Sequence, residues 1–537
     1  MKRAMRKIPM TMATQHPDSA TKFVPIRDEV EEAAFSLKKP NEGLGCGEYM
    51  VDYMGKLTPY HQIGQIVLRL SKENLVPGRD VFITPRMISD FAEEPFRQFM
   101  TLFAVMEGIY HSINLHGEQG IIEIVQAMTK TTEDLVRCEE RANSLFYILE
   151  NELNIPRRDK KLKIIPLFEG IIELLSTRDI ITRYVTAVGV KDYMRVFLGA
   201  SETALLYGHP ASVLACKVAL SDCEKIKAEM GVDVYPILGG GSLPFRGHIC
   251  LENASNFLEE YRGTRTYTIQ SGMRYDHGAE KTIELNEKIR ASPTREAPGF
   301  SSEDRNKIVT SIMIFAKNYL QEVSEIADRV QAIAQFVPDQ RERILGSEEV
   351  AYYRELRDIQ SLVSYFHDKN LAQVVEQLDM DKFKKLPRVI KFTAALYTCG
   401  LPPELIGTGS ALKEIRETQG QEWLNTLLNE VNPSLLSDIE KATKYYGKDF
   451  LITKRISESI ENLKSLITFH ELDNRYAILV KVAVSYLKDL EAGKRTTPEK
   501  FAIQIAPGEI SDYMGSSVSA NLGKLILDLG KLRGSLG

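Results

Sequence analysis

Short apolar runs recur along this chain and end in polar or glycine-rich residues, and this alternation most limits what the chain can fold into. The runs are "PMTMAT" (9–14), "DVFITP" (80–85), "IIEIVQAM" (121–128), "KIIPLFE" (163–169), "RVFLGAS" (195–201), "VYPILGG" (234–240), "RTYTIQS" (265–271) and "ELIGTG" (404–409). Such runs are typical of strands buried on both faces of a parallel sheet. Most of the longer stretches between them have helical periodicity, so that Ile308, Ile312 and Phe315 share one helix face. The pattern predicts strands that alternate with helices.

Alternating strands and helices form either a (β/α)8 barrel or a doubly wound open sheet, and counting elements leaves both architectures open. The barrel is favoured because the runs end in residues that carry chemistry, and barrel enzymes place their sites at the C-terminal ends of the strands. We therefore expect an α/β fold, a TIM-type barrel with extensive additional helices. Residues 1–537 are predicted to form one large barrel domain, with helical insertions notably in 280–400 and a helical C-terminal region over 411–537. Helices are expected over 303–335, 348–366 and 456–492.

Composition limits the class of protein and its partners. The 537 residues are 43% hydrophobic and 26% charged, as in a soluble globular enzyme, and carry a net charge of −5. No Lys/Arg stripe with interleaved aromatic residues is present, so we expect no nucleic-acid partner. No apolar stretch reaches the roughly 18 residues of a membrane span, and polar residues follow the basic start where a secretory signal needs an apolar core. The six cysteines form no CxxC pair, which favours reduced thiols and a cytoplasmic location.

Two carboxylates follow neighbouring predicted strands. "KIIPLFEG" ends with Glu169, and "RVFLGASETA" places Glu202 just beyond the next strand. A barrel would bring both acids to one mouth, where hard oxygen ligands suit Mg²⁺ or Mn²⁺; magnesium typically takes one or two carboxylates and keeps several waters. The alternative is that both acids stabilise the N-termini of the following helices.

The stretch "LGGGSLPFRGH" supplies a glycine-rich loop and an arginine. Gly240, Gly241 and Ser242 follow a predicted strand, and Arg246 comes five residues after Gly241. Glycine lets backbone N–H groups approach an anion, and a guanidinium holds phosphate or carboxylate through two parallel hydrogen bonds. The loop matches neither a Walker A nor a Rossmann fingerprint, so on its own it is equally consistent with a simple turn.

Further polar side chains follow other strands. Arg86 comes after the second run, and Gln270 and Arg274 come after the seventh. A single arginine commonly only solvates a surface, but three at strand ends together with two carboxylates indicate a substrate with several negative charges bridged by a metal. Phosphorylated carboxylic acids have that chemistry.

The first run is followed by a histidine in a polar turn. His16 precedes the rigid Pro17, and Lys22 lies a little further on. A lone histidine usually has a structural role. Its place after a strand makes His16 a candidate for proton transfer, since imidazole titrates near neutral pH. Lys22 is added to the predicted substrate-binding residues.

Taken in order, the motifs "TQHPDS", "PLFEG", "LGASETA", "GGGSLPFRG" and "TIQSGMR" resemble those of the archaeal-type phosphoenolpyruvate carboxylases, a shorter relative of the bacterial and plant enzymes. The resemblance covers essentially the whole chain. It implies a catalytic histidine at His16, metal ligands at Glu169 and Glu202, a catalytic arginine at Arg246 and a substrate-binding glutamine at Gln270. Arg86 corresponds to a further catalytic arginine of the family by order more than by motif.

The chain departs from the longer enzymes at several positions. "YPIL" precedes the glycine-rich loop where they have a histidine and an arginine, "IGTGS" lacks their arginine, and Leu205 stands where they have a lysine. Glu202 replaces an aspartate, and Gly272 replaces the glutamate that follows the glutamine.

The resemblance implies Mg²⁺-dependent, biotin-independent carboxylation of phosphoenolpyruvate by bicarbonate, through carboxyphosphate and a pyruvate enolate, to give oxaloacetate and phosphate. It also implies a homotetramer. Two alternatives stay open: a Mg²⁺-dependent C–C lyase of the oxaloacetate or citrate lyase sort, and a catalytically degenerate phosphoenolpyruvate-binding sensor.

Overall fold

Eight parallel strands close into a barrel in sequence order. The computed structural model describes residues 8–15, 19–54, 56–89, 95–153, 162–339, 375–383, 386–447, 450–493 and 522–537. Its strands are β1 (Thr11–Thr14), β2 (Glu48–Asp52), β3 (Phe82–Ile88), β4 (Glu123–Ala127), β5 (Lys163–Phe168), β6 (Tyr193–Gly199), β7 (Asp233–Gly239) and β8 (Thr266–Ile269). Pairing of β1 with β8 closes the barrel, with Met12 opposite Thr268. The predicted TIM-type barrel is confirmed, and the open sheet is excluded.

One expected strand is wrong and one real strand was not expected. The run 404–409 is not a strand: its residues form the 3-10 turn η6 (Pro403–Leu405) and the start of α16 (Thr408–Gln419). The missing strand is β2, whose sequence EYMVD has an acid at each end. Both acids are fully buried and ion-paired, Glu48 with Arg195 and Asp52 with Arg86. A search for apolar runs misses β2 because charged residues stand at these buried positions.

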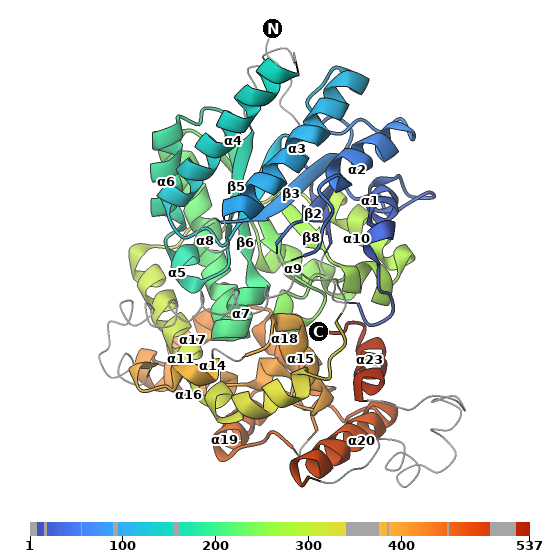
Figure 1. Ribbon diagram of the computed structural model, residues 1–537. Coiled ribbons are helices and arrows are strands. Elements are labelled where there is room, and N and C mark those ends of the chain that lie inside the picture. The colour runs from blue at the N-terminus through green and yellow to red at the C-terminus, as the bar shows by residue number, and fades with distance from the viewer. Residues whose placement is uncertain are drawn as a thin grey trace, which may run out of the picture.

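Helices surround the barrel as an outer ring (Figure 1). They are α1 (Glu29–Leu37), α2 (Gln62–Ser71), α3 (Pro95–His116), α4 (Thr132–Glu152), α5 (Ile171–Leu175), α6 (Thr177–Val188), α7 (Ala200–Tyr207), α8 (His209–Met230), α9 (Ala254–Glu260) and α10 (Ala279–Ala291). In α2, for example, Ile63, Ile66 and Val67 form a buried apolar stripe at 0% exposure.

The barrel interior is filled rather than open. Side chains alternate across each strand, so every second residue points inward. A central apolar layer includes Met12, Val125 and Phe197. Nearer the N-terminal ends of the strands, buried Arg195 binds Glu48 at 2.7 Å and Glu123 at 2.9 Å. The filled interior leaves the C-terminal ends of the strands as the place where a substrate can approach.

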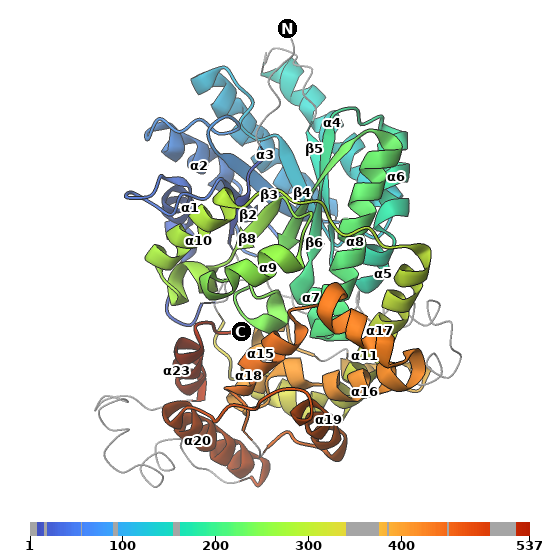
Figure 2. The ribbon, with the colours of Figure 1, turned by 180° about the vertical axis from the view of Figure 1, so that it is seen from behind.

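A second layer of helices lies across that end of the barrel. We call the residues from Ser302 onward the C-terminal helical region; it contains α11 (Ser302–Ala334), α14 (Met380–Phe383), α15 (Val389–Thr398), α16, α17 (Gln421–Thr426), α18 (Leu435–Thr443), α19 (Lys454–Lys464), α20 (Asn474–Glu491) and α23 (Leu522–Arg533). Figures 1 and 2 show it next to α7, with the chain's C-terminus between the two layers. The helix expected over 303–335 is confirmed.

Two other expectations about helices have different outcomes. The helix expected over 456–492 is two helices, α19 and α20, and the stretch 348–366 lies outside the described residues. No helix within the described ranges has the length and apolarity needed to cross a bilayer.

Candidate active site

Glu169 and Glu202 follow the C-terminal ends of the neighbouring strands β5 and β6. Glu169 directly follows β5, and Glu202 is in the first turn of α7, which begins where β6 ends. The backbone N–H of Met128 donates to Glu169 Oε2 at 3.1 Å, and the Thr203 hydroxyl donates to the Glu169 carbonyl at 2.7 Å. These bonds fix the end of β5 against the first turn of α7. Both acids are half-buried.

Arg86 completes this group from β3. Its Nε and one terminal nitrogen donate to the two Asp52 oxygens at 3.0 and 2.9 Å, a bidentate pair across register-matched positions of β2 and β3. Burial works to lower the pKa of Arg86, but Asp52, and beyond it Glu169 and Glu202, raise that pKa above its usual value. Arg86 is therefore a fixed cation that interacts electrostatically with both predicted metal ligands, Glu169 and Glu202.

The donor set fits a sparsely ligated hard cation. Within the described ranges no cluster of three or more His, Cys, Asp or Glu side chains is placed to enclose a metal ion. The two predicted ligands, Glu169 and Glu202, would match the one or two carboxylates that Mg²⁺ commonly uses while keeping waters and substrate oxygens. A structural Zn²⁺ would require a closed set of about four ligands.

Arg246 belongs to a second group of polar side chains. It belongs to the 3-10 turn η2 (Pro244–Arg246) beyond β7 and is 3% exposed. Its guanidinium donates to Gln270 Oε1 at 2.6 Å, to the main-chain oxygen of Gly537 at 2.6 Å and to the Ser201 hydroxyl at 3.4 Å. Because Ser201 precedes Glu202, the two groups adjoin.

The glycine-rich loop folds back on itself. The N–H of Gly240 donates to the Thr268 hydroxyl at 2.9 Å, and the N–H of Gly241 donates to the Arg246 carbonyl at 2.7 Å. The Gly240 N–H is thus bonded to β8 and the Gly241 N–H within the loop, and their contact with a substrate anion stays a prediction. The loop is also closely packed: a Cβ on Gly241 would lie 3.1 Å from Arg246 Cζ and from Gln270 Oε1.

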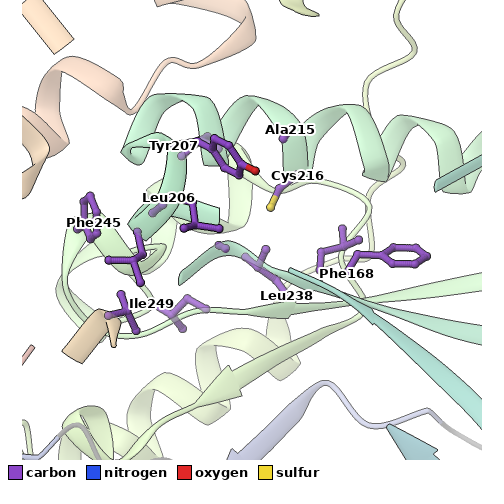
Figure 3. Packing of buried hydrophobic residues seen from close by; sticks show 14 of the residues in the cluster. Phe168, Leu206, Tyr207, Ala215, Cys216, Leu238, Phe245 and Ile249 are labelled. Atoms are coloured by element: carbon purple, nitrogen blue, oxygen red, sulfur yellow. The ribbon is translucent and has the colours of Figure 1, made fainter. Parts of the chain in front are cut away.

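Ser242 in the same loop is buried, and its hydroxyl has no hydrogen-bond partner in the described part of the chain. It is the residue of this loop with a polar side-chain atom left over for a ligand. Figure 3 shows the loop's apolar side: Phe245 and Ile249 lie in the cluster that contains Leu206 and Tyr207 of α7.

Arg274 and Lys22 are engaged elsewhere. The Arg274 guanidinium donates to Glu32 at 2.8 Å and to Ser36 at 3.1 Å, both on α1, and also to the Thr14 carbonyl. Lys22 is exposed, with its ammonium 4.7 Å from the centre of the Tyr275 ring. Their substrate-binding roles stay predictions. His16 lies outside the described residues, although Gln15 immediately before it is buried.

Sequence reasoning missed the polar residues that follow β2. Gln15 Oε1 accepts the backbone N–H of Asp52 at 2.9 Å, which joins the ends of β1 and β2. Lys56, 3% exposed, is ion-paired with buried Glu29 and lies 3.4 Å from Gln15 Oε1. The sequence could have placed Asp52 and Lys56 near Gln15 only if β2 had been predicted as a strand.

Comparison with known proteins assigns the family. The model of the phosphoenolpyruvate carboxylase family matches residues 8–537. A phosphoenolpyruvate carboxylase of Methanopyrus kandleri is 38% identical over 449 residues, covering 82% of this chain and 84% of the relative. One of Methanosarcina acetivorans is 35% identical over 551 residues, covering 98% and 99%. Among solved structures, a malate synthase of Haloferax volcanii covers 70% of this chain and 99% of its own at 11% identity, with a TM-score of 0.38 that is too low to add to the assignment. The chain belongs to the phosphoenolpyruvate carboxylase family.

Proposed function

We propose that this chain carboxylates phosphoenolpyruvate with bicarbonate and releases oxaloacetate and phosphate. The observation that supports the proposal is the closed barrel, which brings the strand ends that carry Glu169, Glu202 and Arg86 to the end where Arg246 donates to Gln270 and Ser201. Two acids suited to a divalent cation and two buried guanidinium groups would then share one site. This arrangement suits a substrate that carries both a phosphate and a carboxylate.

The protein groups have separate tasks in this proposal. Glu169 and Glu202 would hold Mg²⁺ or Mn²⁺, which when bound stabilises negative charge on phosphate and enolate oxygens. Arg86, kept in place by Asp52, neutralises charge that develops on the transferred phosphoryl group. Arg246, held by Gln270, does so from the turn beyond β7. Closure of the loop 239–247 keeps water from the enolate, which water would otherwise protonate to pyruvate.

We assign to His16 the proton handling in the breakdown of carboxyphosphate. The sequence supports this through its place directly after β1, next to the buried Gln15. We expect His16→Asn to keep phosphoenolpyruvate and metal binding and to lose most oxaloacetate formation. Calorimetric binding of phosphoenolpyruvate, measured alongside turnover, checks both halves. Normal carboxylation by this variant would remove His16 from the mechanism.

A coupled assay tests the proposed reaction. Oxaloacetate formation is followed through malate dehydrogenase and the loss of NADH, with and without bicarbonate, and phosphate release is measured in parallel. We expect both products to require bicarbonate and to appear in equal amounts. Cleavage of oxaloacetate or citrate without any phosphoenolpyruvate chemistry would identify the C–C lyase instead. Binding of phosphoenolpyruvate without turnover would identify the sensor.

Assembly and location belong to the same proposal. We propose a homotetramer in the cytoplasm. The six cysteines are all buried free thiols, as suits a reducing compartment. Phe96, Met100 and Phe103 of α3 recur at helical spacing and are 77%, 51% and 52% exposed, which supplies apolar surface for contacts between subunits. Light scattering of the purified protein measures the assembly directly.

A further inference from the structure

The segment that resembles a strand in the sequence, 404–409, holds the loop that carries Arg246. Glu404 in η6 is 0% exposed, and its Oε1 accepts the backbone N–H of Phe245 at 2.8 Å. The Tyr397 hydroxyl, from α15, lies 2.8 and 3.0 Å from the two Glu404 oxygens. One carboxylate of the C-terminal helical region is thus bonded to the residue next to Arg246.

Burial of the Glu404 carboxylate is energetically unfavourable. Burial raises the pKa of Glu404, although His209, the Tyr397 hydroxyl and the Phe245 N–H act in the opposite direction. A buried carboxyl group destabilises the fold if it is charged, and an apolar side chain of similar size would usually be more stable. We therefore infer that Glu404 serves through its hydrogen bonds rather than by filling space.

What it holds is the start of η2. The first N–H groups of a helical turn have no acceptor within the turn, and Glu404 supplies one for Phe245. The Phe245 ring packs 6.2 Å from the ring of Phe392 and 6.5 Å from that of Tyr319, measured between centres. Figure 3 shows this ring at the edge of the apolar cluster on α7. The main chain of Arg246 is thereby fixed on one side by Glu404 and on the other by its own bond to Gly241.

The same pair of residues also supports the other contact of Arg246. The Arg533 guanidinium carbon lies 4.4 Å from the centre of the Tyr397 ring, and Arg533 donates to the Leu536 carbonyl at 2.6 Å. The next residue, Gly537, accepts a hydrogen bond from Arg246. The unit formed by Glu404 and Tyr397 therefore supports both the backbone of Arg246 and the segment that its guanidinium contacts.

We propose that Glu404 is a positioning residue for phosphoenolpyruvate carboxylation, acting through Arg246. The inference rests on the proposed function. Displacing a guanidinium by about 1 Å can reduce a rate about 100-fold, so the effect should be large although Glu404 lies outside the substrate group.

Three variants test the proposal. Glu404→Met removes the acceptor and keeps the volume, and we expect kcat/KM to fall about 10- to 100-fold. Glu404→Gln keeps an oxygen for the Phe245 N–H, and we expect near-normal kcat/KM. The matched control is Glu139→Met, which removes a buried carboxylate that accepts the Tyr184 hydroxyl at 2.5 Å on the outer ring of the barrel. Its kcat/KM should equal that of wild type. If Glu404→Met does not fold, Glu404→Asp, which withdraws the carboxylate by one methylene, replaces it with the same expected direction.

A double-mutant cycle shows whether the effect passes through Arg246. In an Arg246→Ala background, Glu404→Met should cause little further loss, because the group that it positions is gone. Equal losses in both backgrounds would overturn the proposal, as would full activity of Glu404→Met.

Amide hydrogen exchange of the 241–249 peptide separates this inference from the proposed function. We expect faster exchange in Glu404→Met but not in Glu139→Met, whatever reaction the enzyme catalyses. Unchanged exchange would refute the positioning role. If wild type makes no oxaloacetate while Glu404→Met shows faster exchange, the proposed function fails and the support of the loop by Glu404 stands.

Discussion

Glu169 is the residue at which the metal proposal is most directly tested. Its Oε2 accepts one backbone N–H, from Met128, and its side chain is half-buried. We expect Glu169→Gln to weaken Mn²⁺ binding, measured by electron paramagnetic resonance, and to raise the Mg²⁺ concentration for half-maximal activity, because an amide oxygen carries no full charge. The melting temperature should change little. Glu229→Gln, on the far end of α8 and paired with Arg178, is the control and should leave both titrations unchanged. An unaltered Mn²⁺ titration in Glu169→Gln would remove it from the ligand set.

Glu322 links stability to pH. Burial raises its pKa to about 8, and it accepts the Gly407 N–H at 2.6 Å. Between about pH 5 and 8 the folded state holds a proton that the unfolded chain has released, so rising pH favours unfolding by up to about 1.4 kcal/mol per pH unit. Above pH 8 the dependence levels off. Glu322→Gln has no such proton, and we expect its stability relative to wild type to increase from pH 5 to 8. Urea unfolding of both proteins across this range measures the difference, and parallel pH profiles would contradict the assignment.

The positions of residues near the end of a strand could be predicted from the sequence. The positions of residues that depend on contacts with distant side chains could not. Glu169 and Gln270 directly follow β5 and β8, and Arg86 lies near the end of β3, so all three are at the end of the barrel where the parallel strands end together. Arg274 comes five residues after β8, inside the π-helical turn Gly272–Asp276, which turns its guanidinium toward Glu32. Asp52 has no signal of its own, since only the fold shows that it binds Arg86.

Among the elements, the loop after β7 depends on the small size of Gly241. Its Cβ position lies against Arg246 Cζ and Gln270 Oε1, so Gly241→Val forces both side chains aside. We expect more pyruvate relative to oxaloacetate, because a displaced loop admits water to the enolate. Lactate dehydrogenase and malate dehydrogenase assays measure the two products. Gly299→Val, at a glycine with open space around it, should keep the wild-type ratio. An unchanged ratio in Gly241→Val would show that the loop only connects two elements.

The two errors in the strand prediction have the same physical origin. Apolar content predicts burial but not which element is buried. The run 404–409 is buried because it packs under η2, with Leu405 and Ile406 at 0% and 1% exposure, and it contains the helix-starting Gly407. In β2 burial is achieved with charges, as Glu48 and Asp52 are neutralised by arginines from strands that are distant in sequence. Long-range ion pairs of this kind leave no local pattern.

At the scale of the whole molecule, the candidate site is shared between the barrel and the C-terminal helical region. The barrel supplies Arg246, and the helical region supplies the acceptors Glu404 and Asp438, which bind the neighbouring Phe245 and His248. The pKa of Asp438 is lowered well below its usual value: burial opposes ionisation, but His248 and His209 outweigh it. The alternation of strands and helices predicted the barrel but contained nothing about this docking, since helices that pack on a barrel end and helices that project from it share one periodicity.

The last residue, Gly537, allows a direct test of whether the C-terminal helical region helps to position Arg246. Gly537 lies so close to α15 that an added Cβ would meet the Ile390 carbonyl, and its main-chain oxygen accepts from Arg246. Gly537→Ala must therefore displace the tail and deprive Arg246 of one partner, and we expect kcat to fall about tenfold while the barrel stays folded. Lys531→Ala, on the exposed side of α23 and paired with Asp528, alters the same region without touching α15 and should keep full activity. Stopped assays and thermal melting of the two variants separate a local displacement from unfolding. Wild-type turnover in Gly537→Ala would mean that Gln270 and the loop alone orient Arg246.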